Sequence, residues 1–395
     1  MIYLDNGATT FPKPEAVYEA VDYFARHKGV NAGRGAYKSA REATAMIARV
    51  KAMLLSLIDA REQAEVAFTP SVTIALNMVI NGLKWQAGDV VYVSPYEHNA
   101  VLRPLHLLKK RIGIRVLELP LDNDLSIDLN QTAEMFDKEP PKLVCVTAIS
   151  NVTGYVLPAR EIFMLAKEYG AFTLLDGAQA VGLLKIRFGQ VRADAVTFAG
   201  HKTLYAPFGI AGLYIKNGVD LEEFIVGGNG IKAENPEMPR YMPAKLESAS
   251  MDSVAIAGLE ASLHWLKGVN PWEHEGKLVR QLLGELKQIP EVILYPAPGD
   301  DYCQAGVVSF NLKGFRANEV AAILDYKYDI AVRAGHHCAG LIHRHLNNKA
   351  FDGTVRISLG MFNTKNDIDK LISGLKSIDR NVLKNIDKDI LRGNC

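Results

Sequence analysis

The sequence predicts an α/β fold with a large, mainly parallel sheet followed by a smaller α/β unit. Three observations carry this prediction. Short apolar segments alternate with helical stretches from about residue 64 to 215, which is typical of a parallel sheet covered on both faces. A second, shorter alternation follows from about residue 305 to 378. At 395 residues the chain also exceeds what one hydrophobic core usually holds, so two domains are expected.

In the first half we expect two helices and then the alternation. The opening helix is indicated by apolar residues at helical spacing, among them Val17, Val21 and Phe24. The expected helices are 15–28, 38–58, 73–83, 97–112 and 158–169. The expected strands are the segment ending at Phe68, then VVYVS, IRVLEL, KLVCVTA, FTLLD, DAVTFA and GLYI. GLYI follows its neighbour after only about a dozen residues, so we expect it to run antiparallel.

In the second half, residues 227–246 contain glycines and prolines without a clear period, and we expect a loop. The elements expected after it are helices 254–267 and 275–289, strand 305–312, helix 316–327, strands 330–333 and 354–359, and helix 364–378. The tail beyond Ile378 is charged, and we expect it to fray.

Composition excludes several classes of function. The net charge is +1 with no basic cluster, which argues against nucleic-acid binding. No run of 18 apolar residues is present, so no membrane segment is expected. The four cysteines form no CxxC pair, which argues against a disulfide framework or a structural zinc site. Without a recognisable signal peptide, we expect a cytoplasmic protein.

Two polar runs each close a predicted strand. Asp176-Gly177-Ala178-Gln179 ends FTLLD, and Ala199-Gly200-His201-Lys202 ends DAVTFA. Open α/β sheets bind their ligands at the carboxyl ends of neighbouring strands. Pyridoxal phosphate needs a lysine for its aldehyde and an acid for its pyridinium nitrogen, and this pair could supply both. An ordinary strand-end Asp and a surface Lys would give the same pattern.

A candidate phosphate site opens the predicted helix after Phe68. Ser71 and Thr73 in TPSVTIALN stand where backbone N–H groups and hydroxyls meet at a helix start. A plain helix cap would place the same residues there.

DGAQA and AGHK resemble the core of the class V, fold type I pyridoxal-phosphate enzymes. The runs YLDNGATTFPKPE (3–15) and RAGHHCAG (333–340) resemble the cysteine desulfurase and selenocysteine lyase branch of that family. The resemblance extends from Tyr3 to about Ile378. It implies a large domain (15–255) with a mainly parallel seven-stranded sheet, and a small α/β C-terminal domain (256–395) that residues 1–14 join.

The resemblance also implies the residues that hold pyridoxal phosphate. Lys202 would bond the aldehyde, Asp176 would face the pyridine nitrogen, and His98 would stack on the ring and transfer protons. The remaining cofactor contacts would come from Thr73 and His201 at the phosphate, from Asn151 and Gln179 at the ring oxygen, and from Ser250 of a partner subunit. A homodimer follows from that last contact. The family usually has a hydroxyl residue where this chain has Ala199, so one phosphate contact is missing.

The same resemblance implies the substrate site. Arg356 in TVRISLG would bind the substrate carboxylate with its guanidinium fork, and Asn151 would assist. Arg34 in NAGRGAY matches another active-site arginine, although Gly33 replaces the family's usual histidine before it. A surface Arg in an ion pair is the simpler alternative for Arg356.

Cys338 decides between reaction types. A lone cysteine is usually an inert apolar residue, but glycines allow this one to move and neighbouring histidines favour its thiolate. The resemblance of RAGHHCAG to the desulfurase branch implies an L-cysteine desulfurase that forms alanine and a Cys338 persulfide. The segment after Cys338 is short, as in those members of the branch that use a separate sulfur-acceptor protein. Alternatives are a selenocysteine lyase, or an aminotransferase or β-lyase that leaves Cys338 unused. A non-enzymatic family member kept as a scaffold is a third, suggested only by Ala199 and Gly33.

Overall fold

The computed structural model describes the chain except residues 34, 231–233, 300–302 and 387–395. A seven-stranded sheet has the order β2-β8-β7-β6-β5-β3-β4. β8 runs antiparallel to both neighbours, and the other neighbouring strands are parallel. The mainly parallel sheet and the antiparallel GLYI strand are therefore confirmed. The strands are β2 (Ala64–Thr69), β3 (Val90–Val93), β4 (Arg115–Glu118), β5 (Leu143–Thr147), β6 (Phe172–Asp176), β7 (Ala195–Ala199) and β8 (Ala211–Lys216).

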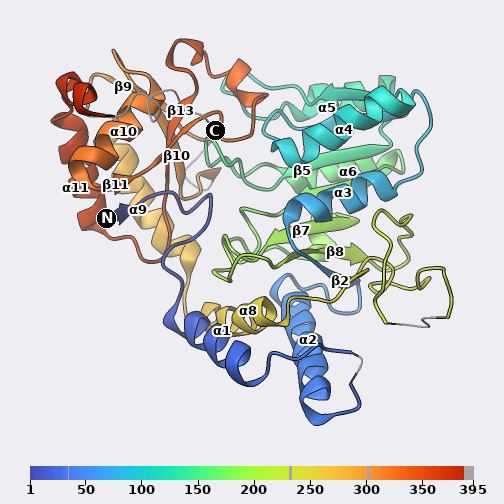
Figure 1. Cartoon of the computed structure of the whole chain (residues 1–395). Coiled ribbons are helices and arrows are strands. Elements are labelled where there is room, and N and C mark those ends of the chain that lie inside the picture. The colour runs from blue at the N-terminus through green and yellow to red at the C-terminus, as the bar shows by residue number, and fades with distance from the viewer. Residues whose placement is uncertain (34, 231–233, 300–302, 387–395) are drawn as a thin grey trace.

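Helices cover both faces of this sheet, because its strands are apolar on both sides. In β3, Tyr92 belongs to one core while Val91 and Val93 belong to the other. The face of Val91 packs against α3 (Val72–Gly82) and α4 (Asn99–Ile112). The opposite face packs against α2 (Lys38–Leu57), α5 (Leu129–Lys138), α6 (Ala159–Glu168), α7 (Phe188–Val191) and α8 (Ser253–Leu266). α1 (Glu15–His27) lies along α8 beside α2 (Figure 1).

The register of the parallel strands brings three polar residues to one edge of the sheet. Thr147 at the end of β5 pairs with Asp176 at the end of β6, and Asp176 pairs with Thr197 of β7. These carboxyl ends are where the candidate site begins.

A second, antiparallel sheet has the order β12-β13-β10-β9. Its strands are β9 (Val292–Tyr295), β10 (Val307–Leu312), β12 (Arg333–Gly335) and β13 (Thr354–Ser358). Its core is shared with α9 (Pro271–Leu286), α10 (Ala317–Tyr328) and α11 (Lys365–Lys376), which group beside it in Figure 1. Leu4 belongs to the same core, and β1 (Ile2–Tyr3) pairs with β11 (Ile330–Ala331). The proposed domain division at residue 255 stays a prediction.

Most predicted elements match the structure within a few residues, and three differ for physical reasons. α9 begins four residues earlier than expected (271 against 275), because Pro271 starts the helix and Asn270 accepts the Glu273 N–H. The strand expected at 330–333 divides at Val332, since β11 pairs with β1 whereas β12 pairs with β13. Residues Arg380–Asn385 form a 3-10 helix, η4, that contacts α10, where we expected fraying. Residues 387–395 of that tail lie outside the described part.

Short 3-10 helices, η2 (Ile342–Arg344) and η3 (Lys349–Phe351), follow β12. Between β8 and α8 the described residues form turns and bends, as expected for a loop. In the described part of the chain, no helix combines the length and apolar character needed to cross a bilayer.

Candidate active site

Asp176 and Lys202 line one cavity of about 130 Å³ at the carboxyl ends of β6 and β7. The Asp176 carboxylate is buried, and its Oδ1 accepts hydrogen bonds from Ala178 N at 3.0 Å and Thr197 Oγ1 at 3.2 Å. Burial lowers the pKa of Lys202 to about 8, although the Asp176 charge opposes that change. A Cβ at Gly200 would lie 2.5 Å from Ile210 O, so the turn before Lys202 needs a glycine.

Seven of the predicted residues line this cavity together. They are Thr73, His98, Asn151, Asp176, Gln179, His201 and Lys202, with Ser71, Val72, Ala100, Thr147, Ala178 and Ala199 between them. Gln179 is held by a hydrogen bond from its Nε2 to Gly7 O at 2.7 Å. Residues from β5, β6, β7 and two helix starts thus converge on one space.

His98 is the N-cap of α4 as well as a wall of the cavity. Its Nδ1 accepts the Ala100 N–H at 3.0 Å, so the proton of the neutral ring is on Nε2. Burial, followed by the charge of Lys202, lowers the pKa of His98 to about 4. His98 is therefore a neutral hydrogen-bond donor with a fixed tautomer.

The other end of the cavity suits an anion. The first turn of α3 begins there, with the Ser71 hydroxyl accepting the Ile74 N–H at 3.4 Å. Thr73 lines the cavity beside it. The His201 ring stacks on Phe208 at 4.5 Å, and its buried Nδ1 has no partner among the described residues. Helix-start N–H groups and an unpaired imidazole nitrogen are groups that bind phosphate.

The chain's N-terminal segment holds the turn that carries Lys202. The His201 carbonyl accepts hydrogen bonds from Thr10 N at 3.1 Å, Thr9 Oγ1 at 2.9 Å and Lys13 Nζ at 2.8 Å. Burial lowers the pKa of Lys13 to about 7. The N-terminal segment thereby links the large sheet to the second sheet, where Asn6 N donates to Ser358 O at 3.2 Å.

Arg356 lies on β13 and is 2% exposed. Its Nη2 is 2.5 Å from Oδ1 of Asp5, and its Nη1 donates to Asn151 O at 3.0 Å. The buried Nε has no partner among the described residues. Burial lowers the pKa of Arg356, whereas the Asp5 carboxylate raises it. Arg356 is not among the residues that line the Lys202 cavity, but its guanidinium contacts Asn151, which is.

Cys338 is exposed and lies in the loop between β12 and η2. Its carbonyl accepts the Asn99 N–H at 2.7 Å, and the preceding His337 carbonyl accepts from Asn151 Nδ2 at 2.7 Å. These bonds tie the thiol-bearing loop to α4 and to a residue of the cavity. The His336 and His343 rings meet edge to face at 4.9 Å within the same loop region.

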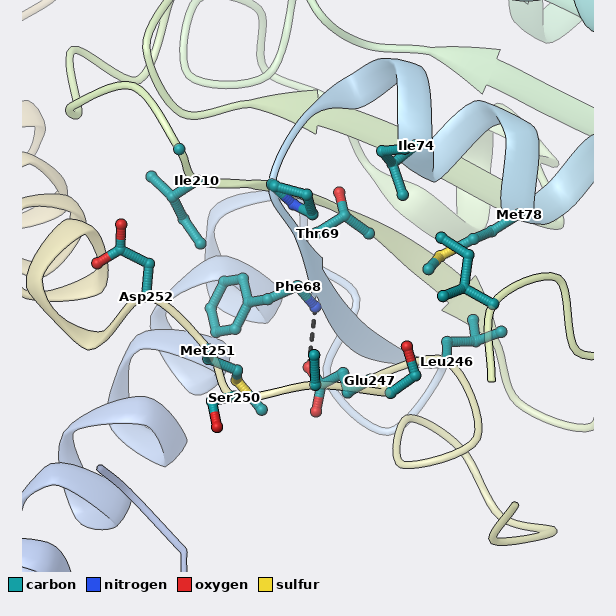
Figure 2. Close-up of a pocket in the computed structure, with 15 residues that line it drawn as sticks. Phe68, Thr69, Ile74, Met78, Ile210, Leu246, Glu247, Ser250, Met251 and Asp252 are labelled. Atoms are coloured by element: carbon teal, nitrogen blue, oxygen red, sulfur yellow. Dashed lines mark hydrogen bonds between the residues drawn. The ribbon is translucent and has the colours of Figure 1, made fainter. Parts of the chain in front are cut away.

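Ser250 is not at this cavity in the single chain. It lines a separate hollow of about 440 Å³, walled by Phe68, Ile74 and Met78 and by residues 246–252 (Figure 2). Glu247 fixes that segment, because it accepts the Phe68 N–H at 2.8 Å and pairs with Lys51 at 2.7 Å. This hollow is larger than the cavity of Lys202 but holds none of the reactive groups described above.

Arg34 lies outside the described residues, so its predicted role stays a prediction. The adjacent Gly33 has φ +90°, a left-handed conformation in which a histidine would be strained. The local backbone therefore explains why glycine occupies this position.

Three residues near the site were not singled out from the sequence: Asp5, Lys13 and Glu97. Asp5 and Lys13 stand inside the YLDNGATTFPKPE run, and Glu97 directly precedes His98. Glu97 is fully buried, and its Oε1 accepts from Ser94 Oγ at 2.6 Å and Thr147 N at 2.5 Å. The available signal was the charge of Asp5 and Lys13 within that run and, for Glu97, its position beside His98.

Comparison with known proteins defines the family. The sequence model described as aminotransferase class-V matches residues 2–371. The chain belongs to the aminotransferase class-V family. A cysteine desulfurase of Escherichia coli O127:H6 is 33% identical over 394 residues, which cover 96% of this chain and 94% of the relative.

Solved structures of this family have the same fold. The apo cysteine desulfurase from Thermococcus onnurineus NA1 superposes with a TM-score of 0.88 at 29% identity, covering 98% of this chain and 95% of that one. The cysteine desulfurase CsdA from Escherichia coli gives a TM-score of 0.83 at 26% identity, with the same coverage. The predicted resemblance to this class V branch is confirmed.

Aminotransferase class-V enzymes use pyridoxal phosphate, and the residues of the cavity fit that cofactor. Lys202 would supply the amine for its aldehyde and Asp176 the carboxylate for its ring nitrogen, since both line the cavity. The start of α3 and the unpaired Nδ1 of His201 suit its phosphate. Ala199 also lines the cavity, but it has no hydroxyl that could bind the phosphate.

Proposed function

We propose that this protein is a pyridoxal-phosphate-dependent cysteine desulfurase, which converts L-cysteine to L-alanine and transfers the sulfur to Cys338. One observation carries the proposal: hydrogen bonds from Asn99 and Asn151 tie the Cys338 loop to the wall of the Lys202 cavity. The cysteine desulfurases among its relatives and structural neighbours support the same assignment.

The overall reaction needs no external oxidant or reductant. The Cys338 thiolate attacks the substrate sulfur, so an S–S bond forms while the substrate's Cβ–S bond breaks. The electron pair of that bond stays with the substrate and, with a proton, becomes a new C–H bond. Both sulfurs are thereby oxidised to the persulfide level and the carbon is reduced, giving L-alanine and the Cys338 persulfide.

The chain's own residues would divide the remaining work. When bound, pyridoxal phosphate withdraws electrons from the substrate's Cα and so weakens its C–H bond. Lys202 would hold the cofactor and carry the Cα proton, and its lowered pKa of about 8 suits both uses. Asp176 would keep the ring nitrogen protonated. His98 would cover the ring and offer its Nε2 proton toward the reacting atoms.

We further propose that Arg356 and Asn151 bind the substrate carboxylate. Arg356 is buried, its Nε has no partner in the described part of the chain, and its Nη1 already contacts Asn151 O. A desolvated guanidinium binds a carboxylate strongly, since water does not compete. Arg34 would complete this part of the site.

A homodimer would bring Ser250 to the partner's cofactor. Ser250 is not among the residues that line the Lys202 cavity of its own chain, so its role needs a second copy. Exposed apolar side chains adjoin residues that line the hollow of Ser250: Phe208 (65% exposed) precedes Gly209, and Val226 (70% exposed) follows Ile225. Such a patch is typical of a subunit interface. We also propose a cytoplasmic enzyme that passes its sulfur to an acceptor protein.

Product analysis tests the function. The purified holoenzyme is incubated separately with L-cysteine, L-cysteine sulfinate and L-selenocysteine, and alanine, sulfide, selenide and pyruvate are measured. With cysteine and a thiol reductant, we expect equal amounts of alanine and sulfide. Pyruvate with sulfide would indicate a β-lyase instead, and turnover of selenocysteine alone would indicate a selenocysteine lyase.

Hybrid dimers test the shared site. Lys202→Ala and Ser250→Glu should each be inactive. After subunit exchange, mixed dimers contain one intact site and should recover part of the activity. Proven exchange without any recovery would show that each chain builds its own site.

A further inference from the structure

The backbone of His337 and Cys338 has a conformation that these residue types rarely adopt. Their φ angles are 49° and 57°, both in the left-handed region. This conformation is unfavourable for a residue with a Cβ, so contacts from neighbouring elements must hold the loop in it. The conformation of the thiol-bearing loop therefore depends on those contacts.

Two hydrogen bonds hold the carbonyls of these residues. Asn99 N, in the first turn of α4, donates to Cys338 O at 2.7 Å. Asn151 Nδ2 donates to His337 O, also at 2.7 Å. The first bond uses a helix-start N–H that its own helix leaves free. The second comes from a side chain, and it can break without disturbing any helix or strand.

Asn151 is also in contact with the residue proposed to bind the substrate carboxylate. Its main-chain oxygen accepts a hydrogen bond from Arg356 Nη1 at 3.0 Å. Asn151 is 9% exposed and lines the Lys202 cavity, so a ligand carboxylate at Arg356 would lie close to its amide. One residue thus contacts both the carboxylate site and the thiol loop.

We propose that Asn151 couples carboxylate binding at Arg356 to release of the Cys338 loop. The inference rests on the proposed function, because it assumes an amino-acid substrate in this cavity. A carboxylate oxygen is a stronger acceptor than a main-chain carbonyl, so the Asn151 amide turns from His337 O to the ligand. The loop then leaves its left-handed conformation, and the thiol gains the freedom to reach the substrate sulfur only when substrate is present.

Hydrogen–deuterium exchange of the segment around residues 336–341 tests this coupling in the holoenzyme. L-Alanine serves as the probe, since it has the carboxylate and amine but no sulfur, and the cofactor's visible spectrum reports its binding. In the wild type, saturating alanine should speed exchange roughly threefold to tenfold, the factor that corresponds to one net hydrogen bond. Asn151→Asp keeps the shape but loses the donor. It should exchange fast without alanine and show no further change.

Asn217→Asp is the matched control, because its amide donates to Glu62 O at the surface, away from the site. It should behave as the wild type. Wild-type exchange that alanine leaves unchanged, although the spectrum shows alanine bound, would overturn the coupling and leave the proposed function intact. Wild-type exchange rates in Asn151→Asp would overturn it too. If alanine does not change the spectrum, the cavity does not bind an amino acid, and the proposed function is contradicted as well.

Discussion

Arg356 and Asp5 form a partly buried ion pair across 351 positions of sequence, with Nη2 and Oδ1 2.5 Å apart. The arginine proposed to bind the substrate carboxylate thus already has a carboxylate partner from the N-terminal segment. Asp5 compensates the buried charge of Arg356 and orients its fork while no ligand is present. An incoming carboxylate must share the guanidinium with Asp5 or displace it.

Asp5→Asn should leave Arg356 without a charged partner and lower the free energy of unfolding by roughly 2–3 kcal/mol. A bound carboxylate then supplies the missing charge, so saturating L-alanine should raise the melting temperature more in this variant than in the wild type. Asp22→Asn is the control, because Asp22 pairs with Arg26 at the exposed surface. Equal alanine-induced shifts in all three proteins would contradict this role for Asp5.

His98 should be replaceable as a helix cap but not as a site residue. Asn is a good N-cap and Ala a poor one, so His98→Asn should be about 1 kcal/mol more stable than His98→Ala. Both variants should lose most turnover, since neither has an imidazole facing the cofactor. Urea unfolding and alanine formation measure the two properties separately. An active His98→Asn variant would refute the proposed role of the ring.

Glu97 should make the protein less stable as pH rises. Burial raises the pKa of this carboxyl to about 8, and the nearby Asp176 charge acts in the same direction. In the unfolded chain the group ionises near pH 4.5, so between about pH 4.5 and 8 the folded state binds the extra proton. Stability is therefore lost as pH rises through this range, by a few kcal/mol for a shift of this size.

Glu97→Gln removes that titration and keeps an acceptor for Ser94 and Thr147. Its unfolding free energy relative to the wild type should improve steadily from pH 5 to pH 8, as measured by urea unfolding. Asp176 and Cys145, whose charges interact with Glu97, are present in both proteins, as is the neighbouring His98. Glu134→Gln, at an exposed i,i+4 pair, should show no such trend. A pH-independent difference for Glu97→Gln would contradict the buried neutral acid.

Lys202→Ala should lose the visible absorption of the bound cofactor and its attachment by borohydride reduction. Lys13→Ala is the matched control, because Lys13 is also partly buried and contacts His201 O at 2.8 Å. It should keep the absorption and the reducible attachment. Peptide mapping identifies the modified lysine. A reduced adduct on any lysine other than Lys202 would contradict the assignment of Lys202 as the cofactor-binding lysine.

The placement of Asp176 and Lys202 in one cavity could be predicted because it depends on local patterns. Apolar segments indicated the strands, and parallel strands bring their carboxyl ends to one edge, where both residues lie. Family motifs then supplied Thr73, His98 and Gln179, which line the same cavity.

Other features depend on contacts between distant segments and could not be predicted from local sequence. The Asp5–Arg356 pair joins the two ends of the chain, and the bonds from residues 9–13 to His201 join the N-terminal segment to its middle. His98 as a neutral cap also required the structure, because its pKa depends on burial and on Lys202. The predicted role of Ser250 involves a second subunit, so one chain leaves that role a prediction.

Cys338→Ser tests the central claim most directly, because the thiol alone distinguishes sulfur transfer from other chemistry in this fold. The variant keeps Lys202, Asp176 and Arg356, so cysteine should still bind and change the cofactor's spectrum. It should form no persulfide and release alanine from cysteine at less than about one hundredth of the wild-type rate, as expected when a nucleophile is lost. Cys303→Ser should retain wild-type activity. If Cys338→Ser releases alanine and sulfide from cysteine as fast as the wild type, the desulfurase mechanism is contradicted.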